Sequence, residues 1–418
     1  MTIRALSSWA TGADRSGFGL NNLPYGVADP GSGPVVVNAI GAYCLDLAAC
    51  AEAGIFSGIT FDPSVMRASS LNPFLDLGAD LHAAIRERVQ TVLSEAAFQT
   101  QINDFLLPSD QVKLLCPLAP GDFIDFYSNY HHAMRAMAAM GLDSEPPENW
   151  FSMPVGYHSR CGTLLGPNDP VRRPHGQRRS RNGPEFGATR ALDFEAEIGF
   201  VTRMGSVHGQ RLTPDDFESA VFGMVLLNDW SARDFQMWES RPLGPLLGKS
   251  FASQVGAWVV PLEALGDARI VSPAQSGSLD YLAHDAPWGF DISIDVFLSS
   301  ETMRAAGVPA KLISETNFKH MHWNSAQQLA HATANGASIR PGDLFGSGTI
   351  SGPERGSEGC LLEMTQFGRT PLEIGEGDTR TWLDDGDVLT IEGAATNRLG
   401  ETVSFGMMRG AVQIGTSK

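Results

Sequence analysis

The sequence lacks the features that mark secreted, membrane and nucleic-acid-binding proteins. Its five cysteines are scattered and form no CxxC pair, so we expect a reducing compartment and no disulfide framework. It has no run of about 18 apolar residues and no signal-like apolar stretch in residues 1–20, which predicts a soluble cytoplasmic protein. The 47 Asp and Glu exceed the 30 Lys and Arg, and the net charge of −17 disfavours nucleic acid and anionic membranes as partners.

Several common catalytic and metal-binding motifs are missing as well. There is no GxSxG of a serine hydrolase, no HExxH of a zinc protease and no EF-hand loop. The stretch LGPLLGKSFAS (243–253) is not a phosphate-binding P-loop, because three residues rather than four separate Gly244 from Gly248. The spacing of cysteines and histidines predicts no tetrahedral zinc site, and we interpret His320 and His322 as structural residues.

The residues that are present indicate a β-rich chain with two domains. The 45 glycines and 25 prolines punctuate many short apolar runs, which is typical of short strands joined by turns. Three prolines around a strand-like VKLL in residues 108–122 predict a domain boundary. We therefore expect an N-terminal domain of residues 1–118 and a C-terminal domain of residues 119–418.

Two helices are predicted from the periodicity of their apolar residues. Residues 73–97 carry an apolar stripe that includes Ile85, with Arg86 away from it, which is typical of a packing helix. Residues 317–336 are predicted to form a second helix, closed by Asn335 and Gly336.

Four carboxylates in three separated segments suggest a cation site. In LDFEAEIGF (192–200), the alternation of a strand places Glu195 and Glu197 on one face, where two like charges repel each other and lose hydration. Asp125 lies in GDFIDFYSNYHHA, and Asp229 directly follows an apolar run, where an unpaired carboxylate is costly. Oxygen ligands of this kind suit Ca²⁺ or Mg²⁺. The alternative interpretation is a solvated strand face.

A set of motifs follows in order along nearly the whole chain. These motifs are NLPYGV (22–27), DFYSNYHHA (125–133), MPVGYHSR (153–160), LDFEAEIGF, GMVLLNDWSARD (223–234), PLGPLLGKSF (242–251) and RPGDLFGSGTISG (340–352). Together they resemble the fumarylacetoacetate hydrolase family in its full-length, two-domain form. NDWSARD alone marks only a wider superfamily of metal-dependent hydrolases and isomerases, whereas the combination of DFYS-x-x-x-HA, PVGYH and GPLLGKSF is more specific.

The resemblance implies a fold and a reaction. The fold is mainly β with some α, in which an N-terminal SH3-like barrel precedes a larger C-terminal β-sandwich roll, and the assembly is a homodimer. The reaction is the hydrolysis of the carbon–carbon bond of 4-fumarylacetoacetate to fumarate and acetoacetate, the last step of tyrosine and phenylalanine degradation. The implied cofactor is Ca²⁺, Mg²⁺ or both, and the implied partner is a small β-diketo acid.

The resemblance also implies roles for residues of this sequence. His132 matches the general base that activates water, and Glu363 matches the acid that orients this base. The other matches are metal ligands (Asp125, Glu195, Glu197, Asp229), a second, structural cation site (Lys249, Ser253), groups that stabilise the leaving enolate (Arg233, Gln236, Lys249) and substrate contacts (Tyr127, Tyr157, Gln236, Thr349).

Two departures from the family pattern concern substrate recognition. The family usually has an Arg after the catalytic His to bind a substrate carboxylate, and this sequence has Met140 and Gly141 there. Ser240 stands where the family usually has Tyr. Arg135, three residues after the catalytic His on a helix, is the first candidate for a replacement, and Arg241 is the second.

Two other functions remain open at this point. The first is a hydrolase of a related β-diketo acid, similar to an acylpyruvase, which would share the acidic ligands. The second is a non-catalytic metal-binding β-protein, in which the acids serve only stability.

Overall fold

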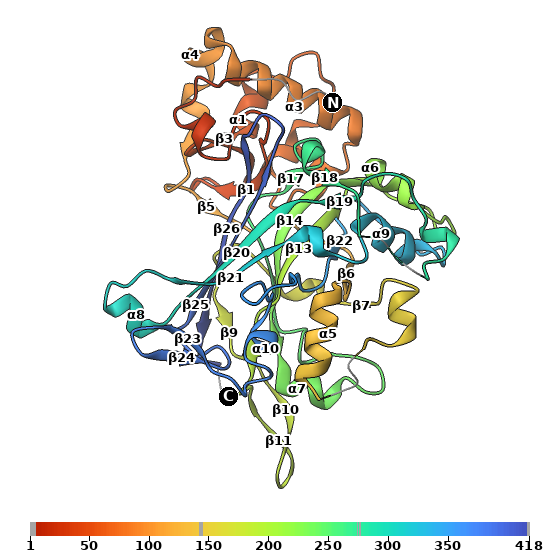
Figure 1. Cartoon of the computed structure of the whole chain (residues 1–418). Helices are drawn as coiled ribbons and strands as arrows, with labels where there is room; N and C mark the ends of the chain where they lie inside the picture. The colour runs from red at the N-terminus through yellow and green to blue at the C-terminus, as the bar shows by residue number, and fades with distance from the viewer. Residues whose placement is uncertain (1–5, 142–144, 274, 276, 416–418) are drawn as a thin grey trace.

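The computed structural model describes residues 6–141, 145–273, 275 and 277–415, and it has a smaller N-terminal part and a larger C-terminal part (Figure 1). The N-terminal part contains a five-stranded antiparallel sheet in the order β4-β3-β2-β1-β5. Its elements are β1 (Tyr25–Asp29), β2 (Val35–Ile40), β3 (Tyr43–Asp46), α1 (Leu47–Glu52), α2 (Asn72–Leu75), α3 (Ala79–Ser94), α4 (Gln99–Ile102), β4 (Leu106–Pro108) and β5 (Lys113–Leu114).

The C-terminal part is built on two larger sheets. The first has the order β7-β6-β22-β13-β14-β16-β8, and β17 pairs with β14 beside this path. Its strands are β6 (Phe123–Phe126), β7 (Gly156–His158), β8 (Leu164–Leu165), β13 (Ala196–Thr202), β14 (Val221–Asp229), β16 (Ser253–Val255), β17 (Val260–Pro261) and β22 (Leu344–Gly346). The second has the order β21-β20-β25-β26-β9. Its strands are β9 (Val171–Arg172), β20 (Ile292–Ser299), β21 (Lys311–Asn317), β25 (Val388–Thr396) and β26 (Thr402–Gln413).

Short ladders and helices complete the C-terminal part. The two-stranded ladders are β10 (His175–Ser180) with β11 (Gly183–Ala188), β12 (Leu192–Asp193) with β15 (Ser231–Ala232), β18 (Arg269–Ile270) with β19 (Gly289–Phe290), and β23 (Leu372–Gly375) with β24 (Asp378–Arg380). The helices are α5 (Tyr130–Ala139), α6 (Phe217–Ala220), α7 (Arg233–Glu239), α8 (Glu301–Ala305), α9 (Ser325–Thr333) and α10 (Leu361–Met364). The structure thus has the predicted abundance of short strands with a few helices. None of its described helices is both long and apolar enough to span a bilayer.

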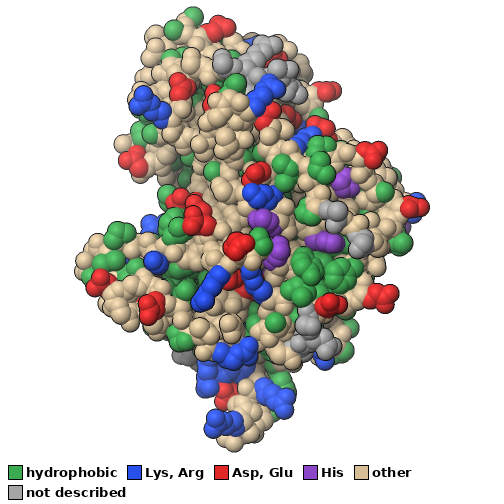
Figure 2. All heavy atoms as spheres, viewed as in Figure 1, with side chains coloured by type: hydrophobic (Ala, Val, Ile, Leu, Met, Phe, Trp, Pro, Cys, Tyr) green, Lys and Arg blue, Asp and Glu red, His purple; other side chains and the backbone are tan. Residues whose placement is uncertain are grey.

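Many of the acidic residues lie on the surface of the molecule (Figure 2). On the face shown in Figure 2, acidic side chains are spread over both parts of the molecule. The basic side chains gather toward the lower end, where Figure 1 places the β10–β11 hairpin.

One apolar core connects the N-terminal part to the eight-stranded sheet. Tyr25 on β1 and Phe74 on α2 contact Phe222 on β14, with ring centroids 5.3 and 5.8 Å from that of Phe222. The backbone of Tyr25 also exchanges two hydrogen bonds with Val259, at 3.0 and 2.8 Å. The N-terminal part therefore packs on the sheet that carries the acidic residues.

The first predicted helix is shorter than expected. Residues 73–97 contain the end of α2 and all of α3, because Gly78, with a φ of 86°, interrupts the helical path. The prediction that Arg86 lies away from the buried stripe is wrong. Its guanidinium is buried and donates to the backbone carbonyl oxygens of Asn21 and Asn22 at 2.7 and 2.9 Å. A cation satisfied by carbonyl groups cannot be recognised from helical periodicity.

The second predicted helix also begins later than expected. Within residues 317–336, a 3₁₀ turn at Phe318–His320 precedes α9. Asn324 caps α9, because its side chain accepts the Gln327 N–H while the Gln327 side chain accepts the Asn324 N–H. Gly336, with a φ of 86°, lies just beyond the end of the helix.

His82 on α3 makes stability depend on pH. It is buried between the two parts of the chain, with Nε2 2.8 Å from the carbonyl oxygen of Phe74 and its ring 5.0 Å from that of Phe222. Burial lowers the pKa of His82 from 6.5 to about 4. Because the unfolded chain binds a proton first as the pH falls, stability decreases by about 1.4 kcal/mol per pH unit between those two values.

A matched substitution tests this dependence. We expect His82→Gln, which keeps a donor for the Phe74 carbonyl, to lose about 2 kcal/mol less stability than the wild type between pH 7 and pH 5. Urea denaturation at the two pH values measures the difference. Parallel losses in the two proteins would show that His82 is not the group that titrates.

Candidate active site and metal centre

The eight-stranded sheet brings acidic residues from three strands to one of its ends. In the parallel β6–β22 pair, Asp125 is opposite Gly346. In the β14–β16 pair, Asp229 is opposite Ser253. Glu197 lies on β13, which is between β22 and β14 in the sheet. Strand pairing therefore makes neighbours of residues that are far apart in the sequence.

Three of the four predicted metal ligands form a buried cluster. Carboxylate oxygens of Asp125, Glu195 and Glu197 all lie within 4.8 Å of one another. Glu195 is 5% exposed and Glu197 is 0% exposed, so the solvated strand face considered for this pair is wrong. Glu195 directly precedes β13. Its backbone N–H donates a hydrogen bond to Asn228 Oδ1 on the neighbouring strand β14.

Glu195 has protein counter-charges that the sequence motifs do not indicate. Its Oε1 accepts a hydrogen bond from Arg233 Nη1 at 2.7 Å, and its Oε2 forms a salt bridge with Lys249. Burial alone would raise the pKa of Glu195, but the Lys249 and Arg233 charges outweigh it and lower this pKa to about 2. Glu195 is therefore ionised and neutralised by two protein cations.

Asp125 and Glu197, in contrast, form no ion pair with another described residue, although the charge of Lys249 acts on both. Among the described residues, Asp125 Oδ1 and Glu197 Oε1 have no hydrogen-bond partner although both are buried. Burial, followed by the charges of the neighbouring carboxylates, raises the pKa of both groups well above the ordinary range. Gly346 keeps the space between them open, because a Cβ there would lie 2.6 Å from Asp125 Oδ1 and 3.0 Å from Glu197 Oε2. Buried, unpartnered oxygens around open space fit a hard divalent cation.

Asp229, the fourth predicted ligand, is linked to this cluster through Tyr157. The Tyr157 hydroxyl lies 2.9 Å from Asp125 Oδ2 and 2.5 Å from Asp229 Oδ2. Asp229 also accepts a hydrogen bond from Ser253 Oγ at 2.8 Å and lies 3.0 Å from Lys249 Nζ. Its carboxylate is thus already occupied by three protein groups.

The second predicted cation position, Lys249 with Ser253, contains an ammonium group. Burial lowers the pKa of Lys249, but Asp229 and Glu195 outweigh this effect and raise it. A protonated ammonium has no free electron pair for a metal. Lys249 Nζ therefore acts here as a counter-charge, and a second cation at this position stays a prediction.

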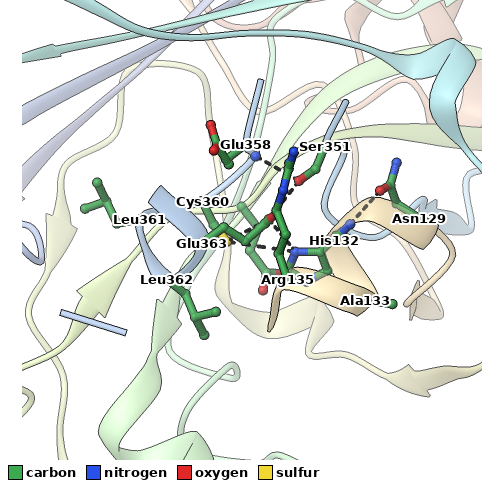
Figure 3. A network of polar contacts seen from close by, with 12 residues as sticks. Asn129, His132, Ala133, Arg135, Ser351, Glu358, Cys360, Leu361, Leu362 and Glu363 are labelled. Carbon is green, nitrogen blue, oxygen red and sulfur yellow. Dashed lines mark hydrogen bonds and ion pairs between the residues drawn. The ribbon is translucent and has the colours of Figure 1, made fainter. Parts of the chain in front are cut away.

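The predicted general base and its orienting acid are in direct contact (Figure 3). His132 lies in the first turn of α5, where its backbone N–H donates to the capping side chain of Asn129 at 2.8 Å. Its Nδ1 lies 2.6 Å from Glu363 Oε1, and both residues are buried. Burial raises the pKa of Glu363, but the contact with His132 outweighs it, so this pKa is lowered. The carboxylate therefore fixes the tautomer that leaves Nε2 free to accept a proton.

Most predicted site residues line a single cavity of about 540 Å³. Its polar wall contains Asp125, Tyr127, His132, Tyr157, Glu195, Arg233, Gln236, Ser240, Arg241, Lys249 and Thr349. Its apolar wall contains Phe126, Ala136, Met137, Met140, Val155, Met237, Pro245, Leu362 and Phe367. The cavity therefore joins the acid cluster, the base and an apolar region.

The two arginines considered for the substrate carboxylate have different positions. Arg135 donates to the backbone carbonyl oxygens of Gly352, Pro353 and Glu354 at 2.9, 2.8 and 3.2 Å, and it does not line the cavity. Arg241 does line the cavity, is exposed, and forms no hydrogen bond or ion pair with another described residue.

Sequence analysis missed two residues that support this site. Asp193 Oδ2 accepts a hydrogen bond from Arg233 Nε at 2.8 Å, and its carboxylate also accepts the N–H groups of Leu361 and Leu362 at the start of α10. Asp193 lies in the same apolar run as Glu195, and this position could have marked it as a candidate site residue. Cys360 Sγ lies 3.3 Å from Glu363 Oε1, and only the tertiary fold brings these groups to His132.

Comparisons with known proteins agree with this arrangement. The family model described as "Fumarylacetoacetate (FAA) hydrolase C-terminal" matches residues 123–412, and "Fumarylacetoacetase N-terminal" matches residues 21–117. The chain belongs to the fumarylacetoacetase family. Fumarylacetoacetase of Arabidopsis thaliana is 38% identical over 419 residues, which cover 97% of this chain and 98% of that protein. The Homo sapiens fumarylacetoacetase is 38% identical, and the match covers 96% of this chain and 97% of that protein.

Solved structures share the fold of this fumarylacetoacetase family member. A fumarylacetoacetate hydrolase from Exiguobacterium antarcticum has a TM-score of 0.55 and 17% identity, covering 94% of this chain and 99% of that one. A maleylpyruvate hydrolase from Sphingobium sp. SYK-6 has a TM-score of 0.51 and 16% identity, covering 94% and 100%. At these identities the likeness concerns the fold alone.

Proposed function

We propose that this protein is a hydrolase that cleaves the carbon–carbon bond of 4-fumarylacetoacetate with water, giving fumarate and acetoacetate in tyrosine and phenylalanine degradation. The observation that carries the proposal is one cavity whose wall includes His132, which is held by Glu363, together with Asp125 and Glu195 of the acid cluster. Near-full-length similarity to fumarylacetoacetases supports the choice of substrate.

His132 has the position of a general base. With Nδ1–H held by Glu363, Nε2 accepts a proton from a water molecule in the cavity, and Glu363 stabilises the imidazolium that forms. The water attacks the carbonyl carbon of the fumaryl end. The bond to the central carbon then breaks, and acetoacetate leaves as an enolate.

Arg233, Gln236 and Lys249 stabilise the negative charge that develops on the departing enolate. Arg233 uses Nε for Asp193 and Nη1 for Glu195 and Gln236, and its Nη2 has no hydrogen-bond partner among the described residues. Arg233 lines the cavity, so its positive charge lies beside the position of the substrate. Tyr127, Tyr157 and Thr349 are proposed as further substrate contacts.

Asp125, Glu195, Glu197 and Asp229 would hold a divalent cation, Ca²⁺ or Mg²⁺. When bound there, the cation acts as a Lewis acid that polarises the diketone oxygens. The unpartnered oxygens of Asp125 and Glu197 support this assignment. Lys249 and Ser253 are proposed for a second, structural cation.

The direct test is a spectrophotometric assay. We expect the absorbance of fumarylacetoacetate to fall on adding the protein, with fumarate and acetoacetate as the only products. A panel of other β-diketo acids tests the second candidate, an acylpyruvase-like hydrolase. That candidate is favoured by Gly141 and Ser240, which stand where the family usually has Arg and Tyr. Faster turnover of a smaller acyl substrate would establish it.

Arg241 is the better-placed residue for the far carboxylate of the substrate. Because Arg241 is exposed at the cavity and has no partner among the described residues, we expect Arg241→Ala to raise KM about 10-fold with kcat little changed, and Arg241→Lys to recover part of the loss. Steady-state kinetics of these variants measure the effect, with Arg135→Ala as the comparison. A raised KM in Arg135→Ala and an unchanged KM in Arg241→Ala would reverse the assignment.

Three broader features belong to the same proposal. Residues 1–118 form an SH3-like barrel domain and residues 119–418 a β-sandwich roll, a division supported by the gap between the two family matches. The protein acts as a homodimer in the cytoplasm.

A further inference from the structure

We propose that His132, Cys360 and Glu363 form a second metal site, which binds Zn²⁺ and thereby switches off the general base. One ligand atom from each of these buried residues lies within 4.8 Å of the other two (Figure 3). The cavity reaches His132, while Cys360 and Glu363 lie on the Nδ1 side of its ring. The three ligand residues are thus different from Asp125, Glu195 and Glu197, which are proposed for the catalytic cation.

The donor set favours a different metal from the one expected at the acid cluster. An imidazole nitrogen, a thiolate sulfur and a carboxylate oxygen are the ligands that Zn²⁺ takes in proteins, whereas Ca²⁺ and Mg²⁺ prefer oxygen alone. The thiolate of Cys360 and the carboxylate of Glu363 together balance the two positive charges of the ion. Two arginines compete with the ion: Arg135 Nη1 lies 3.7 Å from Glu363 Oε2, and the charge of Arg233 acts on Cys360.

The spacing of the three atoms is close to that of a tetrahedral site. His132 Nδ1 to Glu363 Oε1 is 2.6 Å, Cys360 Sγ to the same oxygen is 3.3 Å, and Sγ to Nδ1 is 4.0 Å. Bonds of zinc length at tetrahedral angles separate such ligands by about 3.3–3.5 Å, so each pair has to adjust by no more than about 0.7 Å. Small side-chain rotations bring the three atoms to these separations, and a water molecule would take the fourth coordination position.

A second feature of the site indicates unused binding capacity. Glu363 Oε2 is buried and has no hydrogen-bond partner among the described residues, while Oε1 accepts from His132, Ser351 and Cys360. A carboxylate whose second oxygen has no hydrogen bond, and only the 3.7 Å ion pair with Arg135, can keep the Ser351 contact while it turns toward a metal ion.

Binding at this site would remove the base function without reaching the substrate. Coordination occupies Nδ1 with the metal, so the imidazole proton moves from Nδ1 to Nε2 and the Cys360 thiol releases one proton to solvent. Nε2 then carries hydrogen and has no lone pair to accept a proton from water. This consequence rests on the proposed function, whereas the binding itself does not.

Co²⁺ serves as a spectroscopic probe of binding that is independent of activity. With Mg²⁺ in saturating excess to occupy the acid cluster, added Co²⁺ should give a near-ultraviolet thiolate-to-cobalt charge-transfer band at one ion per chain. We expect Cys360→Ser and Cys360→Ala to abolish the band. Cys161→Ser, which removes a more accessible thiol, should retain it. No band in the wild type, or an equal band in folded Cys360→Ser, overturns the proposal.

Inhibition by Zn²⁺ tests whether metal binding at this site switches off the general base. In the same Mg²⁺ excess, micromolar Zn²⁺ should inhibit the wild type and the Cys161→Ser control, with recovery on adding a chelator followed by Mg²⁺. Cys360→Ser should need at least about 10-fold more Zn²⁺ for half-inhibition, because a thiolate ligand is replaced by a hydroxyl. Equal inhibition of both proteins would place Zn²⁺ at the acid cluster and refute the switch. If the wild type gives the cobalt band but does not hydrolyse fumarylacetoacetate, the proposed function is refuted and the proposed metal site is retained.

Discussion

Replacing His132 with alanine is expected to lower kcat by at least about 10³-fold while the protein stays folded. The side chain lies at the cavity wall, and its Nδ1 is held by Glu363, so the substitution removes the group that is placed to take a proton from water. Steady-state hydrolysis of fumarylacetoacetate measures the loss, and circular dichroism together with the melting temperature verifies the fold. KM should change little, because the imidazole acts on water rather than on the substrate.

Glu363→Gln is the matched variant for this experiment. Glutamine keeps an oxygen that accepts from Nδ1 but loses the charge that stabilises the imidazolium, so kcat should fall by about 10²-fold or more. The two substitutions act on one unit, and their effects should not multiply in the double variant. Substantial activity in His132→Ala would assign the base to another residue.

Removal of the divalent cation is expected to abolish hydrolysis, and re-addition of Mg²⁺ or Ca²⁺ to restore it. A Lewis acid supplies several kcal/mol of transition-state stabilisation, so activity should decrease by at least about 10²-fold on exhaustive chelation. Activity is assayed before chelation, after it and after metal is returned, with metal content measured in parallel. Full activity of metal-free protein would contradict the role assigned to the acid cluster.

Glu195 and Glu197 should respond differently to substitution, although both are proposed ligands. Glu195 neutralises two buried cations, so Glu195→Gln should weaken metal binding and also destabilise the metal-free protein by about 3 kcal/mol. Glu197 lies beside other acids and forms no ion pair with another described residue, so Glu197→Gln should weaken metal binding without lowering metal-free stability. Calorimetry and metal titration measure both quantities. Equal destabilisation by the two substitutions would contradict this division.

The sequence predicts the acid cluster better than it predicts the charges around it. Acids within apolar runs, as at Glu197 and Asp229, are visible as anomalies in the sequence, and both residues are buried. The counter-charges of Glu195 come from other segments, so no spacing rule identifies them. His132 and Glu363 are 231 residues apart, and only the family resemblance connected them in advance.

Long cationic side chains account for the weakest sequence predictions. Arg86 was expected outside the apolar stripe of its helix, yet its guanidinium reaches backbone carbonyl groups in a buried position. Arg135, suggested for the substrate, is bound to three carbonyl groups near Glu363. The arginine side chain has four rotatable bonds, so its donors can reach acceptors in several directions. The position of the residue on the helix therefore does not determine which acceptors it contacts.

The position of β22 in the eight-stranded sheet determines when the acid cluster can assemble. β6, which carries Asp125, pairs with β22, and β22 in turn pairs with β13, next to Glu197. During synthesis, Asp125 therefore cannot join the other acids through the sheet until residue 346 has left the ribosome. Such a late, non-local pairing is slow. It also keeps the repelling carboxylates apart in the nascent chain until the strand that orders them has arrived.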